Sequence, residues 1–189
     1  MDNKLKIINY MGKNLGQPFT MHEFSKLIKV PYATFYRTIQ EMKDLVRIQT
    51  VGKSKSVSLN TENSAIKSYL TISSDEEKKE FIKKQPIINK IALELNTKDI
   101  AVLFGSYAKG NEKSSSDIDI LVINKDGKKT ISFSKYELLF KKKINAIFIT
   151  KSEFKQMLKE KEENVGKQAL KGHVILNNPE SFWECVLNE

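Results

Sequence analysis

The sequence predicts an α+β protein in which an N-terminal part with three helices and a hairpin precedes a C-terminal part built on apolar strands. Residues 1–62 combine helical spacing of apolar residues with two alternating runs, Val46–Val51 and Ser56–Asn60, and such alternation is typical of half-buried strands. Residues 86–189 contain apolar runs that are short enough for buried strands, with helical patterns between them. Residues 63–85 connect the two parts. The apolar runs are Ile100–Phe104, Ile118–Ile123 and Ile144–Thr150.

Helical patterns account for most of the first part. Apolar residues at roughly helical spacing predict one helix over residues 3–15. Thr20, followed three residues later by Glu23, has the form of a capping box and begins a second, short helix. Pro31 is suited to the first position of a third helix, which is expected to run to about Leu45. The hairpin follows this third helix.

Three helices and a basic hairpin, in that order, resemble a winged helix-turn-helix domain. In that family the third helix enters the major groove of DNA and the hairpin, or wing, touches the backbone. The resemblance implies that Tyr32, Thr34 and Arg37 face bases or nearby phosphates. It also implies that Lys53 and Lys55, at the hairpin tip, contact phosphates.

The distribution of charge favours the same partner. The net charge is +9, and residues 1–62 carry ten Lys or Arg against five Asp or Glu, whereas residues 99–189 carry fifteen against thirteen. A basic excess concentrated in one segment indicates a polyanionic partner, so we expect the first part to bind DNA. The alternatives are a lysine-rich composition without such a partner, and a winged helix that serves only protein contacts or the formation of a homodimer.

Length and composition are typical of a folded chain. The 189 residues suffice for one large domain or two small ones, and 40% of them are hydrophobic. No apolar run approaches the ~20 residues of a membrane helix, and residues 1–14 lack the apolar segment of a signal peptide. The single cysteine, Cys185, excludes an internal disulfide framework and a cysteine-rich zinc site. We therefore expect a cytoplasmic protein with no membrane contact.

Two carboxylates flank the start of the second apolar run. Asp117 and Asp119 stand on either side of Ile118, and residues i and i+2 of a strand point to the same face. Adjacent carboxylates repel each other unless a cation lies between them. Oxygen ligands suit Mg²⁺, which takes one or two carboxylates and leaves substrate phosphates to complete its shell. The pair therefore predicts a magnesium–phosphate site.

A glycine–serine pair follows the first apolar run. Gly105 lets the backbone come close to a phosphate. The helix predicted after Ser106 would offer free N–H groups and the positive end of its dipole. Metal ligands on one strand and a phosphate-binding turn on its neighbour together predict a nucleotide site.

These segments also carry a family resemblance. The sequences G-S-Y-A-K-G and S-D-I-D, with eleven residues from Ser106 to Asp117, resemble the signature of the polymerase-β-type nucleotidyltransferase superfamily in its minimal form. Either short motif alone would be weak, but their spacing between two apolar runs makes the pair specific. The matching positions are Gly105, Ser106, Gly110, Ser116, Asp117 and Asp119.

The resemblance implies a small mixed β-sheet flanked by helices in residues 86–189, and a transfer reaction. Asp117 and Asp119 would hold Mg²⁺ or Mn²⁺ together with an NTP, and ATP is the expected nucleotide. The reaction would pass a nucleoside monophosphate to an acceptor, of which a protein is one candidate, and release pyrophosphate. The residues expected to contact the nucleotide are Gly105, Ser106, Lys109, Gly110 and Ser116.

The sequence departs from the family at a third acid. In the family this aspartate lies on the next strand, completes the metal site and can act as a base, but here the position falls on Asn145. An amide offers a carbonyl oxygen to a metal but no negative charge, and it cannot take a proton. Glu137 and Asp126 are candidates to compensate for the missing acid, but neither has the right setting on this strand. The chain is therefore either an active transferase or a catalytically impaired DNA-binding regulator that binds nucleotide or uses the domain as a scaffold.

Further helices are expected outside these segments. In the connector, acids that follow Ser73 predict a helix start, and Pro86 begins an amphipathic helix. Another helix is expected over residues 134–142, and Ser152 is a candidate N-cap for the next one. Trp183, in the tail, is expected in the core.

Overall fold

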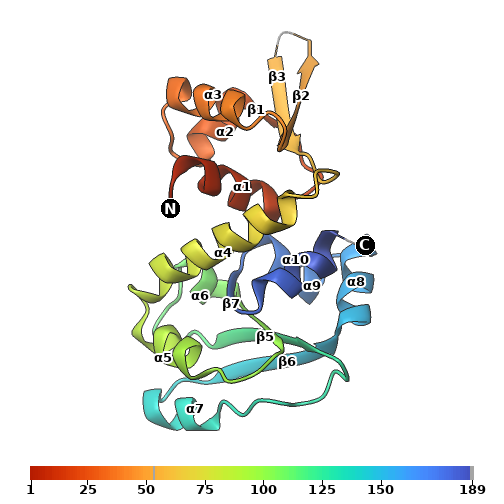
Figure 1. The fold of residues 1–189 in the computed structure, drawn as a ribbon. Helices are drawn as coiled ribbons and strands as arrows, with labels where there is room; N and C mark the ends of the chain where they lie inside the picture. Colours follow the sequence, from red (N-terminus) through yellow and green to blue (C-terminus); the bar gives the residue numbers. More distant parts are fainter. Residues whose placement is uncertain (53, 188–189) are drawn as a thin grey trace. The chain divides into compact units, whose positions relative to one another are not determined.

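The computed structural model describes residues 1–52 and 54–187, and the chain forms two units, Met1–Ser73 and Ser74–Glu189 (Figure 1). The division falls inside one helix, α4, which runs from Ile66 to Ile82. Each unit has its own sheet and its own buried residues, so each is described by itself.

The first unit combines helices with a small antiparallel sheet of strand order β1-β3-β2. Strands β2 and β3 form a hairpin, as the alternating runs predict, and Val46 pairs with Leu59 at its open end. Phe24 and Phe35 are fully buried, and their ring centroids lie 5.3 Å apart between α2 and α3. The elements before α4 are α1 (Asn3–Lys13), β1 (Phe19–Thr20), α2 (Met21–Leu27), α3 (Tyr32–Glu41), β2 (Val46–Val51) and β3 (Ser54–Leu59).

The boundaries of α3 differ from those expected. Pro31 is the N-cap and not the first helical residue, because its ψ of 136° is extended while its carbonyl oxygen accepts the first helical hydrogen bond, from Phe35. The helix ends at Glu41, since the chain then turns to bury both Met42 and Leu45. The two-residue strand β1 was not predicted from the sequence, because two residues carry no periodic pattern.

The second unit is built on a four-stranded sheet of order β6-β5-β4-β7. β4 pairs antiparallel with β5 and β7, whereas β5 and β6 are parallel, which confirms the expected mixed sheet flanked by helices. Its elements after α4 are α5 (Pro86–Glu94), β4 (Ile100–Phe104), α6 (Gly105–Lys109), β5 (Ile118–Asn124), α7 (Ser134–Phe140), β6 (Ile144–Thr150), α8 (Lys151–Lys159), α9 (Val165–Lys171), β7 (Val174–Asn177) and α10 (Pro179–Leu187).

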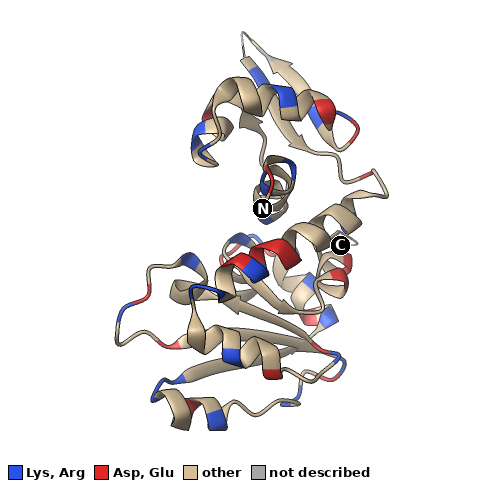
Figure 2. Cartoon of the chain, turned by 60° about the vertical axis from the view of Figure 1, so that its left-hand side comes forward, with Lys and Arg blue, Asp and Glu red and all other residues tan. Residues whose placement is uncertain are grey.

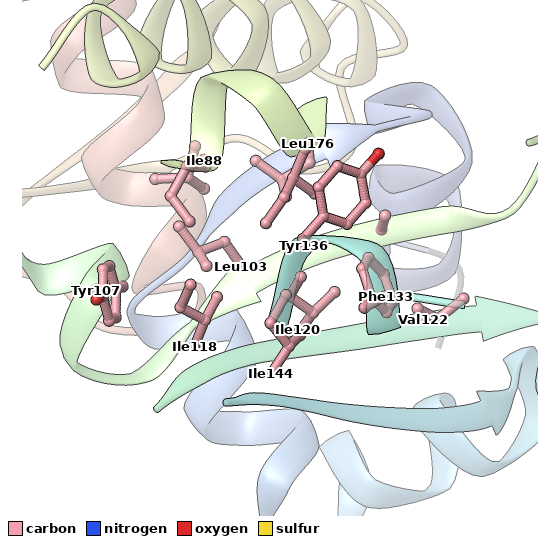
Figure 3. Packing of buried hydrophobic residues seen from close by; sticks show 13 residues of the cluster. Ile88, Leu103, Tyr107, Ile118, Ile120, Val122, Phe133, Tyr136, Ile144 and Leu176 are labelled. Atoms are coloured by element: carbon pink, nitrogen blue, oxygen red, sulfur yellow. The ribbon is translucent and has the colours of Figure 1, made fainter. Parts of the chain in front are cut away.

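One face of this sheet is covered by α5 and α7 (Figure 3). Ile118 and Ile120 of β5 point into a buried cluster with Ile88 of α5 and with Phe133 and Tyr136, at the start of α7. Since side chains alternate along a strand, Asp117 and Asp119 lie on the opposite face. Because Ile118 is buried under α5 and α7, the two carboxylates are held on the other face of the sheet.

Ionic contacts hold α7 against α5. Glu94, the last residue of α5, accepts hydrogen bonds from the Lys135 ammonium at 2.7 Å and from the Tyr136 hydroxyl at 3.0 Å. Lys135, Lys90 and Tyr136 together lower the pKa of Glu94 to about 2. The carboxylate is therefore charged at neutral pH, when these contacts are intact.

Helix α4 is longer than the sequence suggests. A helix start was expected at Ser73, but the helix begins at Ile66 and continues through the polar residues. The Thr71 and Ser73 hydroxyls donate to the carbonyl oxygens of Lys67 and Leu70 in the same helix, both at 2.9 Å. Such bonds accommodate polar residues inside a helix. Charged pairs at i,i+3 follow on α4, where blue and red segments alternate in Figure 2.

Smaller corrections apply at the ends of other elements. Helix α7 ends at Phe140, two residues before the expected end, and Lys141 has a left-handed φ of 51°. The N-cap of α8 is Thr150 and not Ser152, because Thr150 forms a full capping box with Glu153. Strand β7 was not predicted from the sequence, because its pairing with β4 joins segments that are distant in the chain.

Trp183 and Cys185 of α10 are both buried, as expected. Burial raises the pKa of the Cys185 thiol. Across residues 1–52 and 54–187, the structure contains no helix with the length and hydropathy needed to span a bilayer.

Replacing Ser74 by alanine is expected to lower the free energy of unfolding of the second unit by about 1–3 kcal/mol, because the buried Trp183 indole N–H donates to the Ser74 hydroxyl at 2.9 Å and would lose its acceptor. Trp183 is the single tryptophan, so its fluorescence during denaturant unfolding reports the change. Ser73→Ala is the matched control, since the Ser73 hydroxyl donates only within its own helix. Equal losses in the two variants would contradict the importance of the indole contact.

Candidate functional site

The two aspartates lie at the start of β5, as predicted. Asp117 directly precedes the strand and Asp119 is its second residue, and both are half-buried. The backbone N–H of Ile118, between them, donates to the Lys143 carbonyl oxygen at 2.9 Å and begins the pairing with β6. The backbone around both carboxylates is therefore held in place from its first residue.

Gly105 brings the neighbouring strand's end against one of these carboxylates. Phe104, the last residue of β4, pairs with Asp119, and Gly105 follows with a left-handed φ of 72°. A Cβ placed on Gly105 would lie 2.3 Å from Asp119 Oδ2, so the Asp119 carboxylate would have to turn away. The left-handed backbone and this close approach both favour glycine.

Helix α6, which begins at Gly105, has five residues. This short length corrects the prediction that a helix dipole faces the phosphate, because a single turn has a much smaller dipole than a longer helix. Ser106 is half-buried in this turn, and its carbonyl oxygen accepts from Asn111 N at 3.2 Å.

The remaining predicted nucleotide contacts have structural roles. Gly110 ends α6 in a left-handed conformation. The Ser116 hydroxyl accepts from Lys113 N at 2.9 Å and closes the turn before β5. The exposed Lys109 runs along Gly172 at the end of α9, where a Cβ would lie 2.9 Å from its Cε. Each of these residues thus has a local contact or conformation, and its role toward the nucleotide stays a prediction.

Asn145 lies beside Asp119. The parallel register of β5 and β6 pairs the two residues, and Asn145 Nδ2 donates to Asp119 Oδ1 at 3.2 Å. A carboxylate at position 145 would therefore stand next to Asp119 on the same sheet face. The contact made here is a hydrogen bond from an amide nitrogen, so the amide directs its donor group at the carboxylate.

Lys143 is a site residue that the sequence reasoning missed. Its Nζ lies 3.3 Å from Asp117 Oδ2, and the two side chains are 71% and 42% exposed. The sequence could have indicated Lys143, because it lies two residues before Asn145, and residues two apart in an extended chain point to the same face. The adjacent Lys142 instead donates to the Ser114 carbonyl oxygen.

The donor set fits one divalent cation. Asp117 and Asp119 supply the one or two carboxylates that Mg²⁺ takes beside substrate phosphates. Within residues 1–52 and 54–187 there is no group of three or more His, Cys, Asp or Glu side chains that could hold a metal ion. Glu137, considered as a replacement acid, uses Oε1 to accept from Ile144 N at 2.9 Å. Asp126 lies in the loop beyond the opposite end of β5.

The residues predicted to meet DNA lie in the first unit. Tyr32, Thr34 and Arg37 are exposed on α3, and Lys55 is exposed on β3, whereas Lys53 lies outside the described residues. The structure brings these elements together, and Figure 2 shows basic segments on α3 and on the hairpin.

Two further aromatic residues join this surface. The ring of Tyr32 lies between those of His22, at 5.7 Å, and Tyr36, at 6.3 Å, and the Lys55 ammonium lies 6.0 Å from the Tyr36 ring. A cavity of about 350 Å³ is lined by these four residues among others. His22 appeared isolated in the sequence, because its neighbours come from a different helix.

A mixed sheet that carries paired carboxylates on one strand, with a glycine turn from the neighbouring strand against them, is typical of nucleotide-transferring proteins. Comparison with protein-family models gives a match to "Polymerase beta, Nucleotidyltransferase" over residues 85–181, just over half of the chain. The chain therefore belongs to the polymerase beta nucleotidyltransferase family. No curated protein and no solved structure matches it significantly.

Gly105→Ala is expected to destabilise the second unit by roughly 2–4 kcal/mol, because the new methyl group adds a clash with Asp119 to the strain of a left-handed backbone. Gly110→Ala is the matched control, since it has a similar φ of 66° and nothing within 4 Å of the added Cβ. The control should lose only about 1 kcal/mol. Denaturant unfolding followed by Trp183 fluorescence measures both, and equal losses would refute the close approach.

Proposed function

We propose that the protein is a Mg²⁺-dependent nucleotidyltransferase that passes a nucleoside monophosphate from an NTP to an acceptor hydroxyl. One observation carries the proposal: Gly105, which directly follows β4, lies against Asp119 of the neighbouring strand β5, and a side chain at position 105 would displace that carboxylate. This arrangement places a backbone turn suited to phosphate beside a carboxylate suited to a cation. ATP is the expected nucleotide, and a protein is a candidate acceptor.

In this proposal, Asp117 and Asp119 hold the cation and the Gly105–Ser106 backbone contacts the phosphates. The bound metal would neutralise charge on the phosphates and so favour attack at the α-phosphorus. The acceptor oxygen forms a bond to that phosphorus as the bond to pyrophosphate breaks. The hydroxyl proton passes to water, since the Asn145 amide cannot take it.

A second function is favoured by Asn145. The amide donates to Asp119 at 3.2 Å, at the place where a third acid would be needed to act as a base. A protein with this site could bind Mg²⁺ and NTP without fast transfer, and the nucleotide would then regulate the first unit. The two functions share the same ligand and differ in whether label is transferred.

For the first unit, we propose a winged helix-turn-helix that binds DNA. The order of α1, α2 and α3 followed by the β2–β3 hairpin supports this, as does the exposure of Tyr32 and Arg37 on α3. An exposed helix of this kind suits the major groove, and lysines near a hairpin tip suit phosphates. The aromatic rings beside Tyr32 would add apolar contacts to bases.

Incubation of the protein with α-labelled NTP and Mg²⁺ or Mn²⁺ tests the first proposal, with the protein itself, duplex DNA and cell extract offered as acceptors. Transfer should fall on the order of 10²-fold in Asp117→Asn and Asp119→Asn, because the charge that holds the cation is lost. Asp126→Asn is the matched control, since it lies beyond the other end of β5. Metal-dependent NTP binding without transfer would instead establish the regulatory function.

Binding to duplex DNA should weaken steeply as salt rises, because each phosphate contact releases counterions. Lys53→Ala combined with Lys55→Ala should lower the affinity and reduce the salt slope by about two. Arg47→Ala is the control in the same hairpin, since its guanidinium already pairs with Glu62 at 2.6 Å. Fluorescence anisotropy with labelled duplexes measures all three proteins, and no binding at low salt would exclude a role in DNA recognition.

A further inference from the structure

Two-metal sites of phosphoryl transfer hold a second divalent cation beside the first. We infer that this site binds one divalent cation, and that the Lys143 ammonium supplies the positive charge that the second cation would otherwise bring. The inference deepens the proposed nucleotide site and rests on it for the identity of the phosphate ligand. It follows from three features of β6: its register against β5, the charge of residue 143 and the absence of charge at residue 145.

The register puts Asn145 of β6 beside Asp119, and it puts the residue just before β6 beside Asp117. Ile118 pairs with Ile144 and Asp119 with Asn145, so Lys143 stands next to Asp117, one step earlier. The side-chain contacts follow this order, since Lys143 Nζ lies 3.3 Å from Asp117 Oδ2 and Asn145 Nδ2 lies 3.2 Å from Asp119 Oδ1. Both aspartates therefore contact a nitrogen donor from the same strand.

The charge of the site suits one cation. Two carboxylates and one ammonium leave a net charge of about −1 at neutral pH, because lysine is protonated there. A divalent ion at Asp117 and Asp119 reverses that sign, and a second one would meet a positive site with no third carboxylate among the described residues. Like charges placed so close repel each other strongly. A second divalent ion is therefore disfavoured before nucleotide binds, and the ammonium takes its place.

Lys143 is also placed to act on the nucleotide. Its side chain is 71% exposed, so it can leave Asp117 for a nearby phosphate at small cost, because exposed ion pairs are weak. Asp117 would then be released to the cation. One residue would thereby hold the carboxylate before binding and neutralise phosphate afterwards.

Titration of the full chain with Mn²⁺ alone, followed by electron paramagnetic resonance of the free ion, tests this inference without nucleotide. Wild-type protein should bind one Mn²⁺. Lys143→Met should bind it roughly two- to fivefold more tightly, because no ammonium competes for Asp117. Lys142→Met is the matched control and should leave the affinity unchanged, since Lys142 contacts a backbone carbonyl.

The same titration in the presence of a non-hydrolysable NTP tests whether the Lys143 ammonium also neutralises charge on the nucleotide phosphates. Lys143→Met should bind this nucleotide several-fold more weakly at saturating Mn²⁺, while Lys143→Met combined with Asn145→Asp should bind two Mn²⁺ ions. Circular dichroism checks that each variant is folded. Two ions bound by the wild type, no ion bound at all, or an unchanged Mn²⁺ affinity in Lys143→Met would each overturn the inference.

The outcomes also separate this inference from the proposed function. If one Mn²⁺ binds and Lys143→Met tightens it, but neither wild type nor variant binds the NTP, the proposed function fails while the one-cation site stands. If NTP binds with two Mn²⁺ ions, the proposed function stands and the inference about Lys143 fails.

Discussion

The parallel pairing of β5 with β6 is the constraint on which the candidate site depends. Ile118 and Ile120 are fully buried in the cluster under α5 and α7. A slip of one residue would turn Asp117 and Asp119 into that cluster, and buried charges without partners are costly. Hydrophobic burial therefore fixes the register, and the register in turn sets which residues of β6 meet the two carboxylates.

The two aspartates are held differently, and this difference has chemical consequences. Asp119 lies between both neighbouring strands, with Asn145 donating to it and the Gly105 backbone against its other oxygen. Asp117 is held by the exposed Lys143 at the edge strand. A carboxylate fixed on two sides is preorganised, whereas one held by a screened ion pair reorients easily. In the proposed metal site, Asp119 would thus be the fixed ligand and Asp117 the adaptable one.

Membership in the family accounts for the sheet and its aspartates, while the chain's own residues change the balance of charge. Asn145, beside Asp119, carries no charge, and Lys143, two residues earlier, carries a positive one. The family match covers residues 85–181 and leaves the first unit outside it. That unit carries exposed aromatic rings and basic residues on α3 and β3.

The sequence by itself determined β2 to β6, the spacing of the motifs and the shared face of Asp117 and Asp119, because all of these follow from local periodicity and residue type. That Asn145 stands in place of the family's third acid stays a prediction, although the structure pairs Asn145 with Asp119. The sequence could not show β7, the contact of Lys143 with Asp117, or His22 beside Tyr32. Each of these depends on which segments distant in the chain become neighbours, and only the packing of strands and helices decides that.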